Sequence, residues 1–397
     1  MRDMGQTDQT SDRSTVTLFL CGDVMTGRGI DQILPYPSEP RLYEDYLTSA
    51  LDYVALAEER AGPILRPAEF SYIWGEALEE LDRVHPDARI INLETSITTN
   101  EEPEPKGINY RMSPANAPCL TTARIDCCVL ANNHVLDWSV AGLLETLKTL
   151  SANGLKCAGA GRDLVEATTP AIIEIGGDRR VIIFSFGSTT SGIPTDWAAA
   201  QERPGVNLLN DLSDRTIARI AASVRSVKRP GDIVVASIHW GGTWGYEIPR
   251  DQTRFAHGLI DQAEVDVIHG HSSHHPKAIE IWRNKPILYG CGDFLNDYEG
   301  IPGYERFRDD LALMYFVTLD VSTGELVRLD MTPLQIRKLR LNHVSSGDAE
   351  WLRDMLSREG VWFGTTVEIG DGNRLQLLWE RGAGSEPLDC SPEEVRQ

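Results

Sequence analysis

Side chains able to bind a metal ion or move a proton recur along this sequence, close behind short apolar runs. They are Asp23, Glu94, Asn133, His134, His239, His271 and His274. Carboxylate, amide and imidazole groups form the mixed oxygen and nitrogen ligand sets that bind divalent cations. A single Asp or His of this kind is usually a helix cap or a hydrogen-bonded structural residue, but the repetition outweighs that interpretation. The set predicts a metal centre assembled from distant parts of the chain.

The apolar runs that precede these residues are predicted β-strands. They span residues 15–21, 88–93, 127–130, 232–238 and 265–268. Helical periodicity occurs between them at residues 76–84, 140–152, 213–228 and 252–263. Alternating strands and helices predict the α/β class, in which ligands bind at the carboxyl ends of parallel strands. Mixed sheets are expected, because short loops join 171–175 to 181–186, 278–282 to 286–289 and 311–319 to 325–331 as hairpins.

The chain carries a large excess of acidic residues. Its 397 residues include 38 Lys and Arg against 59 Asp and Glu, which gives a formal net charge of −21. A nucleic-acid partner is not expected, because phosphate binding requires basic patches. An anionic membrane surface is disfavoured by the same repulsion. No apolar run reaches the roughly 20 residues that span a bilayer, so no membrane partner is expected.

Cysteine usage and the N-terminal residues predict a cytoplasmic protein. The 7 cysteines are a scattered set that includes the adjacent Cys127 and Cys128, as expected for free thiols in a reducing compartment. Residues 1–14 are polar and lack the basic stretch followed by an apolar stretch that marks a secretory signal. We expect this segment to be disordered.

Six short motifs give the sequence a family resemblance. In order they are Gly22-Asp23-Val24-Met25-Thr26-Gly27-Arg28, Asn92-Leu93-Glu94, Ala131-Asn132-Asn133-His134-Val135-Leu136-Asp137, His239-Trp240-Gly241, Gly270-His271-Ser272-Ser273-His274 and Gly290-Cys291-Gly292-Asp293-Phe294. This ordered set, over about residues 15–297, resembles the CapA, or poly-γ-glutamate capsule synthesis, family, a branch of the calcineurin-like metallophosphatase superfamily. The resemblance implies a four-layer αββα sandwich of two mixed β-sheets, with a metal site at one edge of the paired sheets.

The resemblance also shapes the expected domain organisation. Residues 15–340 are expected to form the CapA-like metallophosphatase-fold domain. Two segments with little periodicity, near residues 35–74 and 98–118, are expected to be cap insertions beside the binding cleft. Residues 341–397 are expected to be a C-terminal extension that packs on this domain and ends in a polar tail.

The resemblance further implies which residues bind metal. Carried over motif by motif, Glu94, Asn133, His239 and His271 are the ligands of one divalent ion. Met25 stands where phosphatases have a His ligand of a second ion, and a soft, uncharged thioether binds hard or borderline cations weakly. We therefore expect one tightly bound ion, with Mn, Zn, Fe or Ca as candidates.

Three residues beside the expected ion are catalytic candidates. With the second ion lost, Asp23 and His274 are expected to be free of ligation and to act as a general acid/base pair. His134 is the third candidate, because its phosphatase counterpart protonates a leaving group. The alternative is that His134 orients Asn133 or bonds Asp137.

Four further residues are expected to contact substrate. Arg28 follows the Asp23 motif and could pair bidentately with a substrate carboxylate, although a surface ion pair would also explain it. Trp240, Trp244 and Tyr246 follow His239 on a glycine-rich loop and could form a stacking wall. Packing beneath the loop would equally explain at least one of these rings.

Together these features predict a metal-dependent acid/base enzyme that acts on a peptide or an amino-acid polymer. The metal would polarise a carbonyl or carboxylate while Asp and His transfer protons, which gives Cα epimerisation of a peptide or amide hydrolysis. The expected partner is a peptide or glutamyl-polymer substrate. One alternative is a metallophosphoesterase, which Met25 disfavours. The other is a non-catalytic partner of a poly-γ-glutamate synthesis complex.

Overall fold

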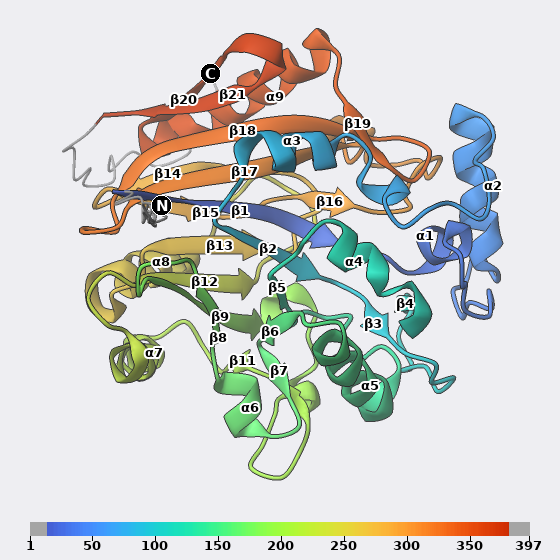
Figure 1. Cartoon of the computed structure of the whole chain (residues 1–397), viewed down its shortest axis with the longest axis horizontal. Helices are drawn as coiled ribbons and strands as arrows, with labels where there is room; N and C mark the ends of the chain where they lie inside the picture. Colours follow the sequence, from blue (N-terminus) through green and yellow to red (C-terminus); the bar gives the residue numbers. More distant parts are fainter. Residues whose placement is uncertain (1–13, 381–397) are drawn as a thin grey trace, which may run out of the picture.

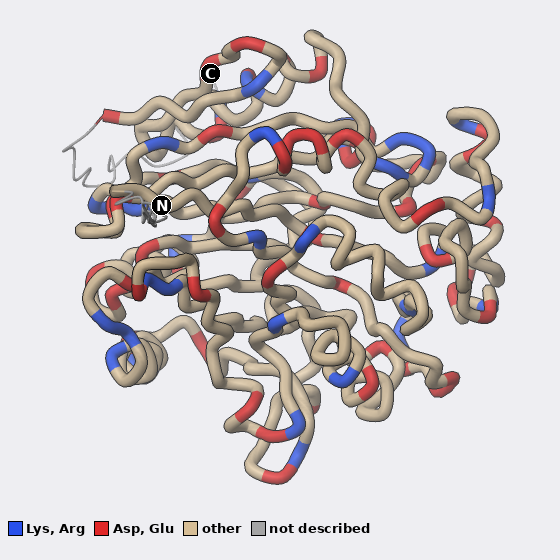
Figure 2. The backbone as a smooth tube through the Cα atoms, in the orientation of Figure 1, with Lys and Arg blue, Asp and Glu red and all other residues tan. Residues whose placement is uncertain are grey.

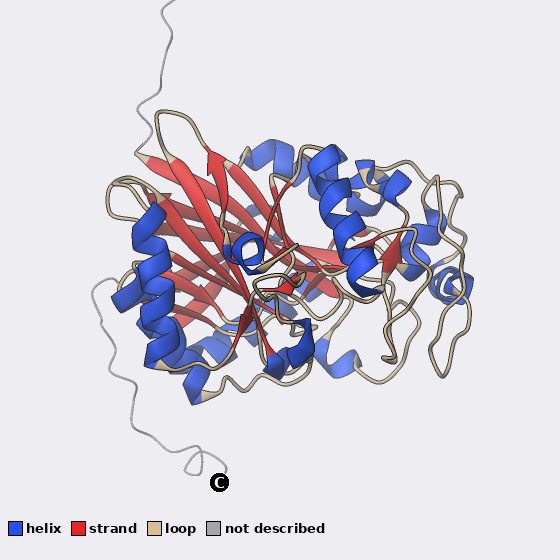
Figure 3. Cartoon of the chain, turned by 90° about the horizontal axis from the view of Figure 1, so that it is seen from below, coloured by secondary structure: helices blue, strands red, loops and turns tan. Residues whose placement is uncertain are grey.

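The computed structural model describes residues 14–380 and confirms an α/β protein with two mixed β-sheets flanked by helices (Figure 1). Viewed from below, the strands form a central block and the helices lie outside it (Figure 3). Of the predicted terminal segments, residues 1–13 and the polar tail beyond residue 380 lie outside the described residues.

The larger sheet contains the first three predicted strands. Its main path runs β20 (Thr365–Ile369), β21 (Leu375–Trp379), β18 (Leu326–Ile336), β17 (Leu311–Asp320), β1 (Thr15–Val24), β2 (Ala88–Leu93), β5 (Cys127–Val129) and β6 (Lys156–Ala158). β16 (Asp293–Leu295) also pairs with β1, and β19 (Leu341–His343) pairs with β18. β1, β2, β5 and β6 are parallel, whereas β17, β18 and β21 are antiparallel to their neighbours. Residues 341–380 therefore add strands to this sheet.

The second sheet contains the other two site-bearing strands. Its order is β11 (Leu208–Leu209), β9 (Arg180–Ser188), β12 (Ile233–His239), β13 (Val267–His271), β15 (Lys285–Leu288) and β14 (Ile279–Trp282), with β8 (Ala171–Glu174) paired to β9. β9, β12, β13 and β15 are parallel, and β8–β9 and β14–β15 are predicted hairpins. Two short ladders lie outside both sheets: β3 (Ser96–Ile97) with β4 (Arg111–Met112), and β7 (Ala160–Gly161) with β10 (Gly205–Val206).

Alternate side chains of β1 pack into different core layers. Leu18 and Leu20 belong to a cluster shared by the two sheets, which also contains Val235 of β12. Phe19 belongs to a cluster that packs the larger sheet against helices, among them α3 (Ala77–Val84) and α5 (Ser139–Ala152). A third cluster packs the second sheet against α7 (Asp214–Val227) and α8 (Arg250–Ala263). Burial on both faces explains why the parallel strands are continuous apolar runs in the sequence.

The remaining helices lie around these layers and at the ends of the sheets. They are α1 (Arg28–Ile33), α2 (Ala50–Ala61), α4 (Pro118–Thr122), α6 (Leu164–Thr168) and α9 (Ser346–Gly360). The segment 35–74 contains α2, and the segment 98–118 contains β4. Acidic residues occur in all parts of the backbone trace, with basic residues scattered between them (Figure 2). Within residues 14–380, no helix has both the length and the apolar character needed to cross a membrane.

The parallel strands bring their polar residues to one region. β1 and β13 run further than predicted, so that Asp23 and His271 lie within strands rather than after them. Gly22 permits the close approach of β16 to β1. The N–H of Asp23 donates to the carbonyl oxygen of Gly292 at 3.0 Å, and a Cβ at Gly22 would lie 1.6 Å from that oxygen. In the second sheet, His239 of β12 lies in register with His271 of β13.

Candidate metal centre

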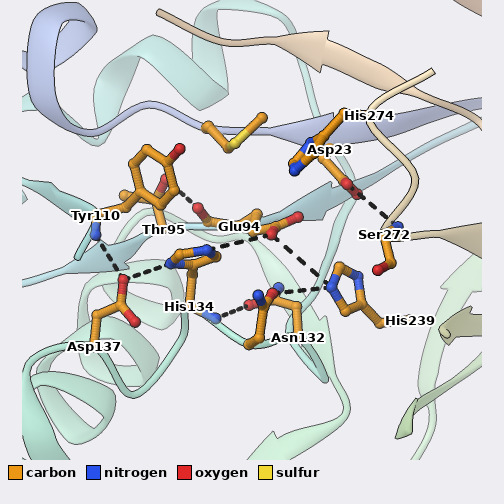
Figure 4. Close-up of polar contacts among 12 residues, drawn as sticks. Asp23, Glu94, Thr95, Tyr110, Asn132, His134, Asp137, His239, Ser272 and His274 are labelled. Atoms are coloured by element: carbon orange, nitrogen blue, oxygen red, sulfur yellow. Dashed lines mark hydrogen bonds and ion pairs between the residues drawn. The ribbon is translucent and has the colours of Figure 1, made fainter. Parts of the chain in front are cut away.

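Asp23 lies in the polar site formed by the strand ends (Figure 4). Its carboxylate belongs to two groups of side chains, and within each group the ligand atoms lie within 4.8 Å of one another. The first group adds His239 and His271, and the second adds His274 and Asp293. These buried clusters could hold a metal ion, and Asp23 is common to both.

A chain of hydrogen bonds fixes the free ring nitrogen of His271. Nε2 of His269 lies 2.7 Å from the carbonyl oxygen of Cys21, which can only accept, so Nε2 of this neutral ring carries the proton and Nδ1 accepts. The Ser237 hydroxyl lies 3.0 Å from that Nδ1 and donates to it. Ser237 therefore accepts from Nε2–H of His271, 2.9 Å away. This leaves the lone pair of His271 on Nδ1.

Asn133 fixes the second imidazole in the same way. Its side-chain oxygen lies 3.0 Å from Nε2 of His239, so Nε2 donates and Nδ1 carries the lone pair. Nδ1 of His239 and Nδ1 of His271 then face each other at 2.7 Å, and Nδ1 of His271 lies 4.0 Å from Oδ1 of Asp23. Burial lowers the pKa of both imidazoles, which keeps the rings neutral. Two converging lone pairs beside a carboxylate are a donor set that fits a divalent cation.

The four predicted metal ligands meet around His239, but on two sides of its ring. His271 faces Nδ1, whereas Asn133 and Glu94 face Nε2, with Oε1 of Glu94 at 3.9 Å. Among the His, Cys, Asp and Glu side chains of the described residues, Asp23 joins His239 and His271 in a group whose ligand atoms converge. Asn133 lies within hydrogen-bond distance of Nε2 of His239, and its place among the metal ligands stays a prediction.

Asn92 joins the two carboxylates at the centre of the site. Its Nδ2 donates to Oδ1 of Asp23 at 2.7 Å and to Oε2 of Glu94 at 3.2 Å, and Asn132 donates to its side-chain oxygen at 3.0 Å. Burial and the carboxylate of Asp293 raise the pKa of Asp23 to about 7. Burial and the nearby Asp23 likewise raise the pKa of Glu94. A bound cation would offset the cost of burying two negative charges together.

His134 lies beside Glu94 with one ring nitrogen towards it (Figure 4). Its Nδ1 lies 2.6 Å from Oδ2 of Asp137, and its Nε2 lies 3.7 Å from Oε1 of Glu94. Lys106 donates to Oδ1 of Asp137 at 2.6 Å. Burial lowers the pKa of His134 to about 4, although Asp137 opposes this, so the ring is neutral at pH 7. His134 therefore forms a hydrogen bond to Asp137 and at the same time faces the site.

His274 forms a second pair of this kind with Asp293. Its Nδ1 lies 2.8 Å from Oδ1 of Asp293, and Asn296 donates to Oδ2 of the same carboxylate at 2.8 Å. Burial disfavours the charged ring, but the carboxylates of Asp293 and Asp23 outweigh it and raise the pKa of His274. Asp293 was not among the predicted site residues, although the last of the six motifs contains it. Its approach depends on the pairing of β16 with β1, which sets it opposite Asp23.

Comparison with known proteins identifies the family. The model of the bacterial capsule synthesis protein PGA_cap matches residues 17–298. The chain belongs to this family. This confirms the predicted resemblance.

Curated relatives cover most of the chain. A probable polyglutamine synthesis accessory protein of Mycobacterium tuberculosis (strain ATCC 25618 / H37Rv) is 47% identical over 365 residues, which are 91% of this chain and 96% of the relative. The PGA biosynthesis protein CapA of Bacillus subtilis (strain 168) is 28% identical over 321 residues, which are 80% of this chain and 70% of the relative. The capsule biosynthesis protein CapA of Bacillus anthracis is 24% identical over 323 residues, which are 81% of this chain and 68% of the relative.

Met25 faces a tyrosine in this member of the PGA_cap family. Its side chain is buried, and the hydroxyl of Tyr298 lies 3.5 Å from Sδ. Asp293 joins Asp23 and His274 in the second group. That group is therefore richer in oxygen than the first.

Arg28 is engaged inside the protein rather than open to a substrate. It is 3% exposed and forms ion pairs with Asp297 and, at 3.0 Å, with Glu44 of the segment 35–74. Its guanidinium carbon lies 3.9 Å from the centre of the Tyr53 ring. These contacts already satisfy its charge, so the structure gives Arg28 the role of joining α1 to that segment.

Of the three aromatic residues expected to contact substrate, Trp244 packs its ring beside His274. Its ring centre is 5.2 Å from that of His274. Trp240 is 2% exposed and belongs to the core cluster that contains α8, so it packs beneath the loop. Tyr246 packs against Phe307, with ring centres 5.5 Å apart.

Proposed function

We propose that this protein is a metal-dependent acid/base enzyme that inverts Cα centres in a glutamyl polymer or a related peptide. The observation that carries the proposal is a pair of imidazoles, each with Nδ1 bonded to a buried carboxylate, on either side of Asp23 and Glu94. His134 lies beside Glu94, and His274 lies beside Asp23 (Figure 4).

Their surroundings shift the pKa values of the two imidazoles in opposite directions, as suits a base and an acid. A carboxylate at Nδ1 leaves Nε2 as the atom that exchanges a proton with substrate. His134, whose pKa is lowered to about 4, is suited to take the Cα proton at Nε2, and His274, whose pKa is raised by Asp293 and Asp23, is suited to return a proton to the opposite face of the carbon. Environments that separate two pKa values supply an acid and a base at one pH. Proton exchange with solvent then restores the starting protonation state of both rings.

A divalent cation would be held by Asp23, His239 and His271, with Glu94 connected to Asp23 through the side chain of Asn92. Bound there, it would polarise the substrate carbonyl and so acidify the Cα proton. Ser237 keeps Nδ1 of His271 free of its proton through the hydrogen bond at Nε2. Carboxylate oxygen and imidazole nitrogen together suit Mn, Zn or Fe better than Ca.

Membership of the PGA_cap family supports a glutamyl polymer as substrate. Relatives are named for polyglutamine synthesis and for PGA biosynthesis. We extend to this chain a role in making or tailoring such a polymer. We also assign it the calcineurin-like four-layer fold, because one core cluster lies between the two sheets, with α9 contributing to it, and the other two pack helices against the sheets.

Hydrolysis is the second candidate function, because Asp23, His274 and Asp293 could hold a second cation. Two ions favour hydrolytic displacement at a phosphoester or an amide, since they stabilise both the attacking and the leaving oxygen. His274 would then be a ligand, and His134 would be the proton donor. The number of ions bound per chain separates the two functions.

Deuterium exchange tests the proposal. Protein loaded with Mn²⁺ is incubated with tetra-γ-glutamate in D₂O, and mass spectrometry measures deuterium at Cα. We expect exchange that requires the metal, with one ion bound per chain. It should be lost when both His134 and His274 are replaced by Gln. His257→Gln is the control, because its Nε2 lies 2.9 Å from a carboxylate of Glu280 outside the site.

Two results would decide against inversion. Absence of exchange by the metal-loaded protein would overturn the proposal. Release of free glutamate from tetra-γ-glutamate, or of phosphate from p-nitrophenyl phosphate, by protein that binds two ions would instead establish the second candidate.

A further inference from the structure

A cavity of about 940 Å³ opens beside the His274–Asp293 pair. It lies between α2, the segment 296–310 and the end of β18, at the side of the molecule where α2 and β19 are drawn in Figure 1. Asn296 and Tyr298 line it. Asn296 donates to Asp293 at 2.8 Å, and the ring centre of Tyr298 is 5.5 Å from that of His274. Two lining residues of the cavity therefore contact the proposed acid or its carboxylate partner, and the cavity volume suits a short peptide.

The inner wall of the cavity presents one uncompensated carboxylate. Asp310 is satisfied by Arg308 at 2.7 and 2.9 Å and by Gln335 at 2.9 Å. The neighbouring Asp309 also lines the cavity but forms no ion pair within residues 14–380. Its backbone oxygen accepts from Asn296, which links it to the site. A half-buried carboxylate of this kind favours a cationic group of a ligand.

The outer rim presents two arginines from opposite walls. Arg60 belongs to α2, and Arg337 directly follows β18. Both are exposed, and neither forms an ion pair in the part of the chain that the structure describes. Glu299 lies in the same cavity, where backbone N–H groups of residues 338 and 339 donate to its carboxylate at 2.6 and 3.3 Å. Both guanidinium groups lie close enough to Glu299 to favour its ionised form, and guanidinium groups are the usual binding groups for carboxylates.

We infer that this cavity binds the amino-terminal end of an anionic glutamyl chain, with its ammonium group at Asp309 and its carboxylates at Arg60 and Arg337. Three groups without an ion pair in the described chain carry the inference: one carboxylate, Asp309, whose backbone oxygen accepts from Asn296 beside the acid/base site, and two exposed arginines, Arg60 and Arg337, on other walls of the cavity. An internal stretch of polyglutamate has no ammonium group to place at Asp309. Glu59 and Glu305 also line the rim and would repel a carboxylate that strays from the arginines. The inference rests on the proposed function and adds that the enzyme acts at a chain end.

Binding of tri-γ-glutamate tests the inference separately from catalysis. Isothermal titration calorimetry compares the peptide with a free amino terminus and the same peptide acetylated there. The free peptide should bind at least about tenfold more tightly to the metal-loaded protein. Asp309→Asn should abolish this preference. Arg60→Gln combined with Arg337→Gln should weaken both peptides about equally, by roughly tenfold.

Two controls keep the test independent of folding. Asp82→Asn changes an exposed carboxylate outside the cavity and should keep the preference for the free terminus. Arg66→Gln removes an arginine that is paired with Glu58 outside the cavity, and it should bind like the unchanged protein.

Equal binding of the two peptides, or an unchanged preference in Asp309→Asn, would overturn the inference. Deuterium exchange provides the separate check. A preference for the free terminus without any exchange at Cα would support this inference and refute the proposed function.

Discussion

Ser237 and His271 form the contact that decides which ring nitrogen of His271 is free. The hydroxyl lies 2.9 Å from Nε2, and because it donates to His269 it accepts from His271. The parallel register of β12 and β13 creates this contact, since Ser237 lies opposite His269 and His239 lies opposite His271. Ser237 does not belong to the converging ligand group, but it decides whether Nδ1 of His271 is free to bind a metal ion.

Ser237→Ala should weaken metal binding. Without the hydroxyl, Nε2 of His271 loses its acceptor, and the ring becomes free to carry its proton on Nδ1. Removal of a group that orients a metal-binding histidine lowers affinity by roughly 10- to 100-fold. Equilibrium dialysis against Mn²⁺ measures the change. Ser185→Ala is the matched control, because Ser185 is the register partner of Ser237 in β9 and its hydroxyl has no hydrogen-bond partner within the described chain. Equal Mn²⁺ affinities of the two variants would contradict the hydrogen-bond relay.

His274→Gln should separate proton removal from proton return. The variant keeps His134, so exchange should continue from the one configuration whose Cα proton faces that ring. Inversion should fall by about 100-fold or more, because the opposite face lacks its proton donor. Chiral analysis of the product and deuterium content at Cα measure the two steps. His134→Gln should exchange only the other configuration. If both variants exchanged the same configuration, the two rings would not serve opposite faces.

The strands that carry the site could be predicted from the sequence. They are buried on both faces and therefore appear as continuous apolar runs. The predicted strand 88–93 coincides with β2. The predicted strand 15–21 stopped short of β1, because Gly22 followed by Asp23 is typical of a strand end. In the structure this glycine continues the strand and gives the backbone of β16 room to approach. The pairing of β1 with the distant strand β16 therefore explains why Gly22 and Asp23 do not end the strand.

Residues whose roles depend on tertiary pairing could not be predicted in the same way. Asp293 approaches Asp23 because β16 pairs with β1. The residue spacing within the last motif does not predict that pairing. Arg28 was a plausible ligand for a substrate carboxylate. Its sequence neighbours do not reveal that Glu44 and Asp297 neutralise it inside the protein. Sequence therefore supplied the candidate groups, and the pairing of segments decided which of them face one another.

Gly22→Ala should destabilise the fold and displace β16 from β1. An added Cβ would lie 1.6 Å from the carbonyl oxygen of Gly292, and a backbone atom cannot move aside without breaking the hydrogen bond from Asp23. Overpacking of this kind costs about 3 kcal/mol. Urea unfolding measures the loss. Gly242→Ala is the control, because a Cβ there would meet no atom within 4 Å. Equal stability of the two variants would show that β16 is not held this closely.

Glu80 joins α3 to the C-terminal part of the larger sheet. Its carboxylate accepts hydrogen bonds from Arg83 at 2.7 Å, from Thr332 of β18 at 3.1 Å and from Arg374, next to β21, at 3.2 Å. Burial alone would raise the pKa of Glu80, but the two arginines outweigh it and lower the pKa to about 2. Since its usual value is 4.5, the ionised form is favoured in the folded protein.

Glu80→Gln should therefore lower stability in a pH-dependent way. A depressed pKa stabilises the fold above pH 4.5, and this contribution is lost as the pH falls from 4.5 towards 2. We expect a loss of about 2 kcal/mol at pH 7, reduced by solvent screening of the partly exposed arginines, and a difference that narrows below pH 4.5. Urea unfolding at pH 7, 4.5 and 3 measures it. Asp82→Asn, in an exposed pair with Arg124, should change stability little at any of these pH values. A Glu80→Gln difference that stayed constant from pH 7 to 3 would show that its ionisation is not what ties α3 to the sheet.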